Sequence, residues 1–224
     1  MNLSNNRLCG VWDEYGKQKG NYNAEGINAI ADALRVNGGL TSLNLSSNQL
    51  FGLDYFGRGT YTAEGITAIA DAMLVNGGLT KLSLAANKLG EEGTKAICEA
   101  LEKNKLLKEL DISGGWFETE GSNIGASAGA KHVAKMLGVN GGLTSLDLSN
   151  NLLCGVTTFG GGTYTAEGIT AIAEALRVNG SLTSLDLSNN VLCGMTKNGG
   201  TYNAEGITAI ADALRVNGAL TRMK

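Results

Sequence analysis

The sequence repeats one short phrase, and this repetition constrains the fold more than any other feature of the chain. Residues 40–50 read LTSLNLSSNQL, and close copies begin at Leu79, Leu143 and Leu182. Each copy is followed, after a gap of variable length, by a helical phrase such as AEGITAIADAM at residues 63–73. Self-similarity at a nearly fixed period is typical of stacked units, in which each unit contacts only its neighbours. We therefore expect one elongated array.

Each unit combines two periodicities. In the strand phrase, Leu43 and Leu45 are predicted to face the core, because alternate residues of a strand point to the same side. The Asn at the ninth position, such as Asn48, is predicted to bond the backbone where the chain leaves the strand. In the helical phrase, apolar residues spaced i, i+3, i+4, i+7 predict a stripe that faces the strands. In one copy these residues are Ile66, Ile69, Ala70 and Met73.

The helix boundaries are marked by residue type. Thr62, Thr165, Asn23 and Asn203 are predicted N-caps, each followed by Ala-Glu-Gly. A tyrosine precedes each cap and an isoleucine follows it four residues later, the spacing of a hydrophobic staple. These tyrosines are Tyr22, Tyr61, Tyr164 and Tyr202. We interpret them as structural, and we predict that the Asn-Gly pairs at residues 37–38 and 76–77 end their helices through a left-handed residue.

These phrases resemble the leucine-rich repeat, and specifically its ribonuclease-inhibitor-like subfamily, also found in NOD-like receptors. The features that carry the resemblance are LTSLDLSNN at residues 182–190 and AEGITAIADALRVNG at residues 204–218, and it covers essentially the whole chain. The resemblance implies a right-handed α/β solenoid, the leucine-rich repeat horseshoe, with a parallel concave sheet and outer helices. It also implies a non-catalytic protein–protein interaction scaffold.

We expect residues 1–224 to form a single leucine-rich repeat domain, with half units at both ends. Its five full units are predicted to start near residues 40, 79, 107, 143 and 182, so the steps between strand phrases are irregular. The extra length is predicted to fall between the end of the strand phrase and the helix start. Tracts such as residues 156–165 surround a glycine turn with β-forming residues and predict inserted β-hairpins. In the unit at Leu107, Gly115 replaces the ladder Asn, which predicts a degenerate unit.

All twelve aromatic residues lie in these connecting segments. Six of them, named below, are not explained by the staple pattern, and two interpretations of these six stay open. They pack on one another to hold the inserts together, or they are exposed anchors for a protein partner, because insertions in repeat arrays fall on one face. The predicted partner-binding residues of this insert ridge are Trp12, Tyr15, Tyr55, Phe56, Trp116 and Phe159.

The concave face of the predicted sheet is a second candidate surface, favoured mainly by the habit of the family. Its central outward positions are small and polar, and no Trp, Tyr or Arg joins them before Arg222. This composition indicates a solvated face, since interface hot spots favour those large residues. The predicted partner-binding residues here are Asn44, Ser83, Asp111, Asp147 and Asp186.

The two ends of the sequence carry complementary parts of a strand phrase. LTRM at residues 220–223, followed by NLSNN at residues 2–6, would nearly complete one copy. End-to-end self-association through Leu3, Leu220 and Met223 is therefore one expectation, beside a fragment of a longer array and a domain of a receptor.

Charge and hydropathy exclude several classes of partner. The formal net charge is −3 and the pI is near 5.3, which argues against nucleic acids and anionic membranes. No run approaches about eighteen apolar residues, so we expect no membrane span and a cytoplasmic protein.

The chemistry-bearing residues form no recognisable catalytic or metal-binding motif. Cys154 and Cys193 hold equivalent positions in adjacent units, so a disulfide stays open, although a row of reduced thiols is the preferred interpretation. No Cys or His spacing indicates a metal, and nothing around His132 forms a catalytic motif. We expect neither a cofactor nor enzymatic activity.

The preferred function is a scaffold that binds a protein partner through the concave sheet, the aromatic-rich insertion loops or both. One alternative is a ligand-sensing, regulatory repeat segment of a larger NOD-like signalling ATPase. A weaker alternative is a carbohydrate- or surface-binding protein that uses the aromatic ridge.

Overall fold

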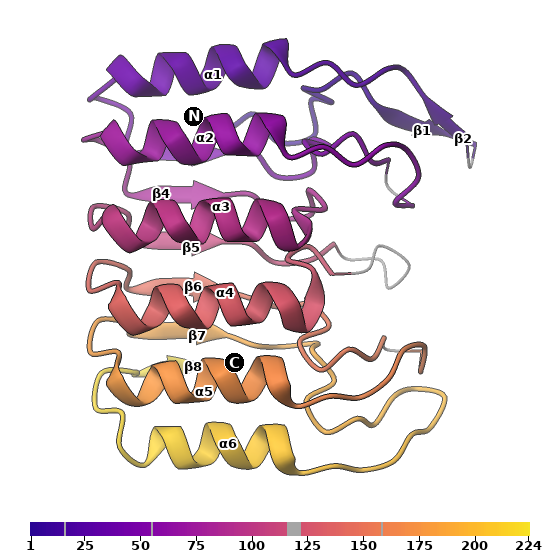
Figure 1. Ribbon diagram of the computed structural model, residues 1–224, viewed down its shortest axis with the longest axis vertical. Helices are drawn as coiled ribbons and strands as arrows, with labels where there is room; N and C mark the ends of the chain where they lie inside the picture. Colours follow the sequence, from indigo (N-terminus) through magenta and orange to yellow (C-terminus); the bar gives the residue numbers. More distant parts are fainter. Residues whose placement is uncertain (16, 55, 116–121, 158) are drawn as a thin grey trace.

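The computed structural model describes residues 1–15, 17–54, 56–115, 122–157 and 159–224. Within these residues, six helices alternate with the strands of a six-stranded sheet, and a separate two-stranded hairpin lies near the N-terminus (Figure 1). The helices are α1 Glu25–Val36, α2 Glu64–Val75, α3 Gly90–Lys103, α4 Ala126–Val139, α5 Glu167–Val178 and α6 Glu205–Leu214. The strands are β1 Trp12–Glu14, β2 Lys17–Lys19, β3 Ser42–Asn44, β4 Lys81–Ser83, β5 Glu109–Asp111, β6 Ser145–Asp147, β7 Ser184–Asp186 and β8 Arg222–Met223.

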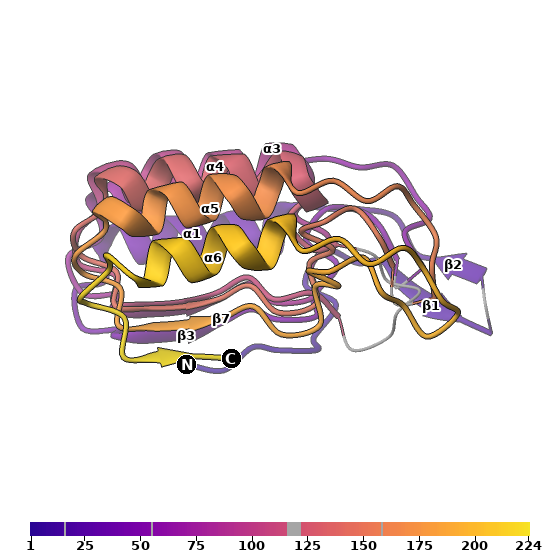
Figure 2. The ribbon, with the colours of Figure 1, turned by 90° about the horizontal axis from the view of Figure 1, so that it is seen from below.

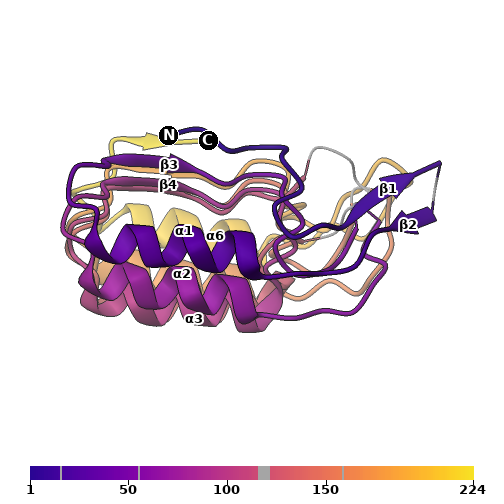
Figure 3. The same ribbon diagram turned by 90° about the horizontal axis from the view of Figure 1, so that it is seen from above.

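The sheet follows the order of the chain. Strands β3 to β8 pair in sequence, and each pair is parallel. The helices form a layer on one face of this sheet, and consecutive helices lie side by side. Figures 2 and 3 show the terminal helices α1 and α6 displaced toward the sheet side relative to α3 and α4, so the sheet lies on the concave side. The predicted α/β architecture, with a parallel sheet and outer helices, is confirmed.

The leucines of the strand phrase build the core between the two layers. The central residue of each strand is in register with its neighbours, as in the pairs Leu43–Leu82 and Leu146–Leu185, and each of these four leucines is buried. Each helix adds its apolar stripe from the other side, for example Ile66 and Met73 of α2. Because the two periodicities meet at the same interface, every unit contributes similar apolar groups to one continuous core.

A ladder of buried asparagines satisfies the backbone where the strands end. The Nδ2 group of Asn87 donates to the carbonyl oxygens of Leu45 and Leu84, at 2.9 and 3.1 Å. Its Oδ1 accepts the backbone N–H of Asn48 from the preceding unit at 2.9 Å. The carboxamide therefore joins two units, as the sequence pattern predicts, and it bonds carbonyl groups of the turn that the strand ladder does not reach.

The prediction that Gly115 replaces the ladder asparagine is wrong. Asn123 takes the place of the missing asparagine: its Nδ2 donates to Leu84 O and Ile112 O, and its Oδ1 accepts the backbone N–H of Asn87. Asn123 in turn donates its backbone N–H to Asn151 Oδ1 at 2.9 Å. The extra residues of this unit therefore precede the ladder position instead of following it, because the ladder fixes the spatial position of the carboxamide but not its distance along the chain.

The predicted N-caps are wrong by one residue: the helices are capped by Ala24, Ala63, Ala166 and Ala204, and the predicted residues lie just before them and bond the backbone from there. Asn23 Oδ1 accepts the backbone N–H of Glu25 at 2.7 Å, and Asn203 Oδ1 accepts that of Glu205 at 2.8 Å. The corresponding contacts of Thr62 and Thr165 are longer, at 3.4 and 3.3 Å. The first orphan N–H groups of these helices thus find partners two residues upstream.

The predicted left-handed helix end at the Asn-Gly pairs is wrong. Asn37 and Asn76 have extended backbone angles, with φ of −88° and −69°. The Asn76 side chain closes the turn instead: Oδ1 accepts the backbone N–H of Leu79 at 2.7 Å, and Nδ2 donates to Leu34 O of the preceding helix at 2.6 Å. The asparagine is required for its side chain, which connects neighbouring helix ends.

The tyrosines before the helices also connect neighbouring units. Tyr61 donates its O–H to Leu89 O at 2.5 Å and accepts the backbone N–H of Gly93 at 3.2 Å, both in the next unit. Tyr164 donates to Leu192 O at 2.9 Å. Burial raises the pKa of Tyr61 and Tyr164 above the ordinary value, so both hydroxyls stay protonated donors.

Among the described residues, no helix is both long enough and apolar enough to cross a membrane.

Candidate protein-interaction surfaces

The inserts between strand ends and helix starts all project from one edge of the structure (Figures 1 and 2). The insert before α1 forms a regular hairpin, in which β1 and β2 pair antiparallel from Trp12–Lys19 to Glu14–Lys17. The described parts of three other inserts are held by single antiparallel bridges, Leu53–Gly59, Val156–Gly162 and Thr196–Gly199. The predicted hairpins are therefore present in one insert as a ladder and in three as isolated bridges.

Besides Tyr202, which lies shortly before α6 and is 64% exposed, three aromatic side chains of the described inserts are exposed. Tyr15 follows β1 at the tip of the hairpin, and its side chain is 99% exposed. Its backbone has a φ of +50°, a region that costs a bulky residue free energy. Phe56 and Phe159 are each about half exposed in the inserts before α2 and α5. Contacts within the chain therefore cover almost none of the Tyr15 side chain and only part of the Phe56 and Phe159 side chains.

The insert before α2 is stiffened by a buried carboxylate. Asp54 is fully buried, and its Oδ1 accepts the backbone N–H groups of Phe56 and Arg58 at 2.9 and 3.0 Å. The Arg58 guanidinium lies 2.6 Å from Asp54 Oδ2 and also stacks over the Phe56 ring, 4.9 Å from its centroid. A paired charge and two backbone bonds thus fix the loop that presents Phe56.

Other aromatic residues of the inserts belong to the interior. Phe51 is fully buried and stacks on Tyr61 with ring centroids 5.4 Å apart. Trp12 is half-buried, and the Arg7 guanidinium lies 5.7 Å from its ring centroid. Of the six predicted ridge residues, Tyr55 and Trp116 lie outside the described residues. The structure therefore separates the others into a half-buried Trp12 and the three exposed rings.

A small hollow of about 340 Å³ lies between the last two inserts, beside Phe159. Its nearest side-chain donors are engaged by the inserts themselves: Asn198 Nδ2 donates to Phe159 O at 2.8 Å, and Thr196 Oγ1 donates to Gly199 O. The Lys197 ammonium lies 5.3 Å from the centroid of the Phe159 ring. These groups build the insert and leave few free donors to a small ligand.

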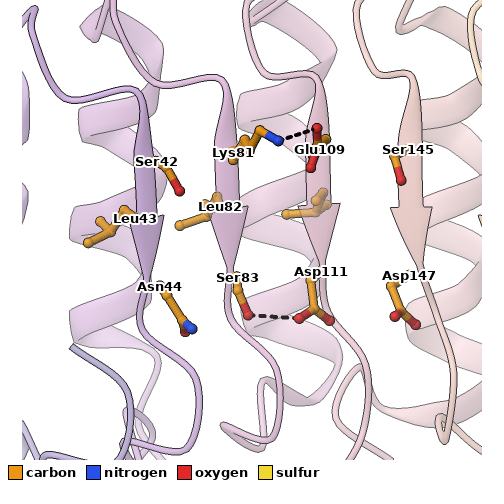
Figure 4. A pocket seen from close by; sticks show the side chains of 11 residues that line it. Ser42, Leu43, Asn44, Lys81, Leu82, Ser83, Glu109, Asp111, Ser145 and Asp147 are labelled. Atoms are coloured by element: carbon orange, nitrogen blue, oxygen red, sulfur yellow. Dashed lines mark hydrogen bonds and ion pairs between the residues drawn. The ribbon is translucent and has the colours of Figure 1, made fainter. Parts of the chain in front are cut away.

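The concave face of the sheet is polar and internally paired (Figure 4). Lys81 Nζ lies 2.7 Å from Glu109 Oε1 on the next strand, and Ser83 Oγ donates to Asp111 Oδ2 at 2.8 Å. These residues surround a shallow hollow of about 350 Å³ that also includes Asn44, Ser145 and Asp147. A face whose charges and hydroxyls bond one another offers a partner polar contacts but no apolar anchor.

The row of carboxylates on this face has a structural role at each strand end. The Oδ1 atoms of Asp147 and Asp186 accept the backbone N–H groups of Ser149 and Ser188, at 2.9 and 3.0 Å, and Asn44 accepts Ser46 N–H in the same way. Because these positions are in register, the carboxylates of Asp111, Asp147 and Asp186 lie on adjacent strands. The five predicted concave residues are therefore brought together on one face.

The electrostatic environment differs along this row. Burial raises the pKa of Asp147, and the flanking charges of Asp111 and Asp186 add to this, although the Ser149 hydrogen bonds oppose it. For Asp186, burial also acts to raise the pKa, but hydrogen bonds from Ser188 and the nearby Lys224 ammonium outweigh it and lower the pKa. The middle carboxylate is thus the least favourably placed charge of the face.

The cysteines are free thiols, and the metal-ligating side chains are dispersed. Cys9, Cys98 and Cys154 are buried and Cys193 is half-buried. Burial raises the pKa of Cys9 and of Cys154 to about 11, which makes both thiols unreactive. His132 lies on α4 with Nε2 3.5 Å from Glu91 of α3. Within the described residues, no three His, Cys, Asp or Glu side chains gather to hold a metal ion.

Comparison with known proteins supports this architecture. No family model and no curated protein matches the sequence. The tropomodulin C-terminal domain from Caenorhabditis elegans is similar in structure, with a TM-score of 0.55 and 15% identity over 85% of this chain and 92% of that one. Leiomodin-1 Actin-Binding Site 2 gives a TM-score of 0.43 and 26% identity over 59% and 61% of the two chains. The leucine-rich repeat-containing protein LegL7 from Legionella pneumophila gives 0.35 and 15% over 99% and 72%. The chain therefore shares the overall fold of the tropomodulin C-terminal domain.

Proposed function

We propose that this chain is a non-catalytic leucine-rich repeat module, similar to the ribonuclease-inhibitor-like subfamily, that binds a protein partner through its insert edge. The observation that carries the proposal is the exposure of three large aromatic rings, Tyr15, Phe56 and Phe159, on the edge where the inserts project. Repeat arrays commonly present such insertions on their binding face.

Free energy favours a recognition role for these rings. An exposed aromatic side chain gains little from folding, and Tyr15 in addition adopts a left-handed backbone. At an interface the same ring would bury a large apolar area with little loss of side-chain entropy, which is why tyrosine is common among binding hot spots. The buried Asp54–Arg58 pair supports this role, because it holds Phe56 in place before a partner arrives.

The concave face would contribute the polar part of the same interface. It adjoins the insert edge, and its serines and carboxylates suit hydrogen bonds at the rim of a contact. The burial of three of the four thiols and the contact of the single histidine, His132, with the Glu91 carboxylate support a binding role without chemistry. Free cysteines also agree with the predicted cytoplasmic location, a reducing compartment.

The proposal can be tested with a pull-down from the source cell. We expect the wild-type chain to retain a partner protein and a Ser145→Lys variant to retain it less strongly, since Ser145 lies on the concave face that contributes the polar part of the interface. A Tyr15→Ala/Phe159→Ala double variant should lose it while keeping its circular dichroism spectrum, because both rings are exposed. Loss with Ser145→Lys alone would place binding on the concave face, and retention by all three proteins would exclude the two rings as anchors.

A further inference from the structure

The edge of the structure opposite the inserts, where each helix turns back toward the next strand, exposes a group of apolar side chains (Figure 1). Leu74 and Val75 lie at the end of α2, and Val139 ends α4. Leu106 lies in the turn after α3. Their exposed fractions run from 44% for Leu74 to 62% for Val75. All four residues, which we call the helix-end patch, belong to inner units that pack against a neighbouring unit on each side.

Hydrogen bonds join the three turns that carry this patch. Asn104 Nδ2, in the turn after α3, donates to Met73 O of α2 at 2.7 Å. On the other side, Lys105 Nζ donates to Val139 O at 2.9 Å. The turn that contains Leu106 is therefore held between the ends of α2 and α4, and the exposed residues of the three units form one surface instead of scattered single side chains.

The fold does not require these residues at these positions. Residues 75–78 read Val-Asn-Gly-Gly, whereas residues 103–106 read Lys-Asn-Lys-Leu. Both turns nevertheless close through the same asparagine bond, which Asn104 makes to the backbone N–H of Leu107 at 3.1 Å. Leu74 likewise stands where α1 and α5 have an arginine. Valine is also a weaker helix former than alanine or lysine. Local structure therefore leaves the apolar character of the patch unexplained.

Three lysines lie beside the patch. Lys103 is exposed, Lys105 Nζ donates to Glu102 O at 2.7 Å, and Lys108 Nζ donates to a carbonyl oxygen of the following turn at 3.0 Å. These bonds complement the negative helix ends, but a carbonyl group carries no net charge, so the positive charge of the lysines remains. The nearby Glu102 carboxylate is already paired, since it lies 2.8 Å from Lys135 Nζ. The patch is therefore apolar with a positive border.

We propose that the helix-end patch binds an acidic amphipathic helix of a partner protein. Leu106 and the ends of α2 and α4 bury the apolar face of this helix, and the three lysines pair with carboxylates beside that face. The spacing suits a helix, because packed helices lie about 8–10 Å apart and an α-helix advances about 10 Å in seven residues. Apolar residues repeated every seven positions therefore meet successive helix ends.

Charge farther along the helices favours a narrow protein segment over a lipid surface. Asp71 and Glu99 are exposed one turn before the ends of α2 and α3. A bilayer with anionic headgroups is broad enough to meet these carboxylates together with the lysines, and repulsion opposes its binding. A single helix along the edge covers the lysines and stays clear of the outer helix face. The positive charge thus matches a partner about one helix wide.

Binding can be measured with a synthetic probe, a fluorescein-labelled peptide of leucine and glutamate about 21 residues long, with its leucines on one helical face. Fluorescence anisotropy should show binding to the wild-type chain at low salt. Leu106→Gly should weaken this binding about five- to tenfold, because it removes an apolar anchor. The variant should keep the wild-type circular dichroism spectrum, since Gly78 holds the equivalent position in the preceding turn.

A charge variant and two controls separate this patch from other surfaces. Lys103→Glu should weaken binding of the peptide about three- to fivefold at low salt, and the loss should shrink at high salt. Val178→Lys changes the equivalent exposed residue of α5, outside the patch, and should bind the peptide as the wild type does. Tyr15→Ala/Phe159→Ala should also bind it normally, so the result is independent of the insert edge.

The proposal is overturned if the wild-type chain does not bind this peptide, or if a peptide with lysine in place of glutamate binds equally well. Binding that ignores both Leu106→Gly and Lys103→Glu also overturns it, because the peptide then occupies another surface. Sedimentation with phosphatidylserine vesicles is the last check. If the vesicles retain the chain and the peptide does not bind, the occupant is a lipid surface and the proposal is wrong.

Discussion

Residues at equivalent positions have the same environment in every unit of the strand–helix stack, but the aromatic residues of the inserts differ widely in burial. In the stack, Asn48, Asn87 and Asn151 are all fully buried and make the same bonds in each unit. In the inserts, aromatic residues range from Phe51, which is fully buried, to Tyr15, which is wholly exposed. A stack residue meets a copy of its own unit on each side, so its environment recurs. An insert meets another insert of different length, so each aromatic residue finds its own environment.

The largest expected effect contrasts two phenylalanines of the inserts. Phe51→Ala should lower the free energy of unfolding by about 3–5 kcal/mol, because it removes a buried ring stacked on Tyr61. Phe159→Ala should change it by less than about 0.5 kcal/mol, since half of that ring is exposed. Urea denaturation followed by circular dichroism measures both. Equal losses would mean that the inserts form a packed core of their own.

The next contrast concerns asparagines. Asn87→Ala should cost about 2–4 kcal/mol, because it leaves buried carbonyls and the Asn48 N–H without partners. Asn198→Ala removes one exposed bond to Phe159 O and should cost about 0.5 kcal/mol. The same denaturation series compares the two variants. A small loss at Asn87 would show that the ladder is replaceable by water or neighbouring groups.

Tyrosine hydroxyls give a smaller effect. Tyr61→Phe should cost about 1–2 kcal/mol, since Leu89 O and the Gly93 N–H lose their shared partner. Tyr15→Phe should leave thermal and urea stability unchanged within about 0.5 kcal/mol, because its hydroxyl is in solvent. If Tyr15→Phe proved destabilising, the hairpin tip would have a structural role that its exposure does not indicate.

The smallest expected effects concern Asp147 and Asp186 on the concave face. Removing the charge of each should change the free energy of unfolding in opposite directions. The raised pKa of Asp147 means that its folded state binds a proton more readily, so the charged form lowers stability at neutral pH. Asp147→Asn should therefore raise the free energy of unfolding by about 0.2–1 kcal/mol, and Asn44 shows that an amide keeps the same backbone bond.

Asp186 provides the opposite case on the same face. Its lowered pKa contributes stability above the ordinary carboxyl pKa, and this contribution is lost as the pH falls through the folded value. Asp186→Asn should thus cost a few tenths of a kcal/mol at neutral pH. Both differences should shrink as the pH falls and the carboxyl groups take up protons. A stabilising Asp186→Asn would contradict the assigned role of Ser188 and Lys224.

The sequence by itself determined the stack. Period-two leucines and an i, i+3, i+4, i+7 stripe leave one arrangement that buries both, namely parallel strands beneath a layer of helices. The bonds of Asn23 and Asn203 to the helix starts and the ladder at Asn87 followed from residue type and position, because their partners lie in the same or the adjacent unit. These features are local, so a single sequence contains them.

Only the tertiary structure decided that Asn123 completes the asparagine ladder, and only it decided which aromatic residues face solvent. Asn123 lies eight positions after the expected Gly115, and its role depends on the carbonyls of Leu84 and Ile112 that meet there. Phe51 and Tyr15 are both aromatic residues of the inserts, and their local sequence does not distinguish them. The Phe51 ring is nevertheless covered by the next unit, whereas the Tyr15 ring is exposed. Periodicity specifies contacts that recur in every unit, whereas a contact made once depends on which segments the completed fold brings together.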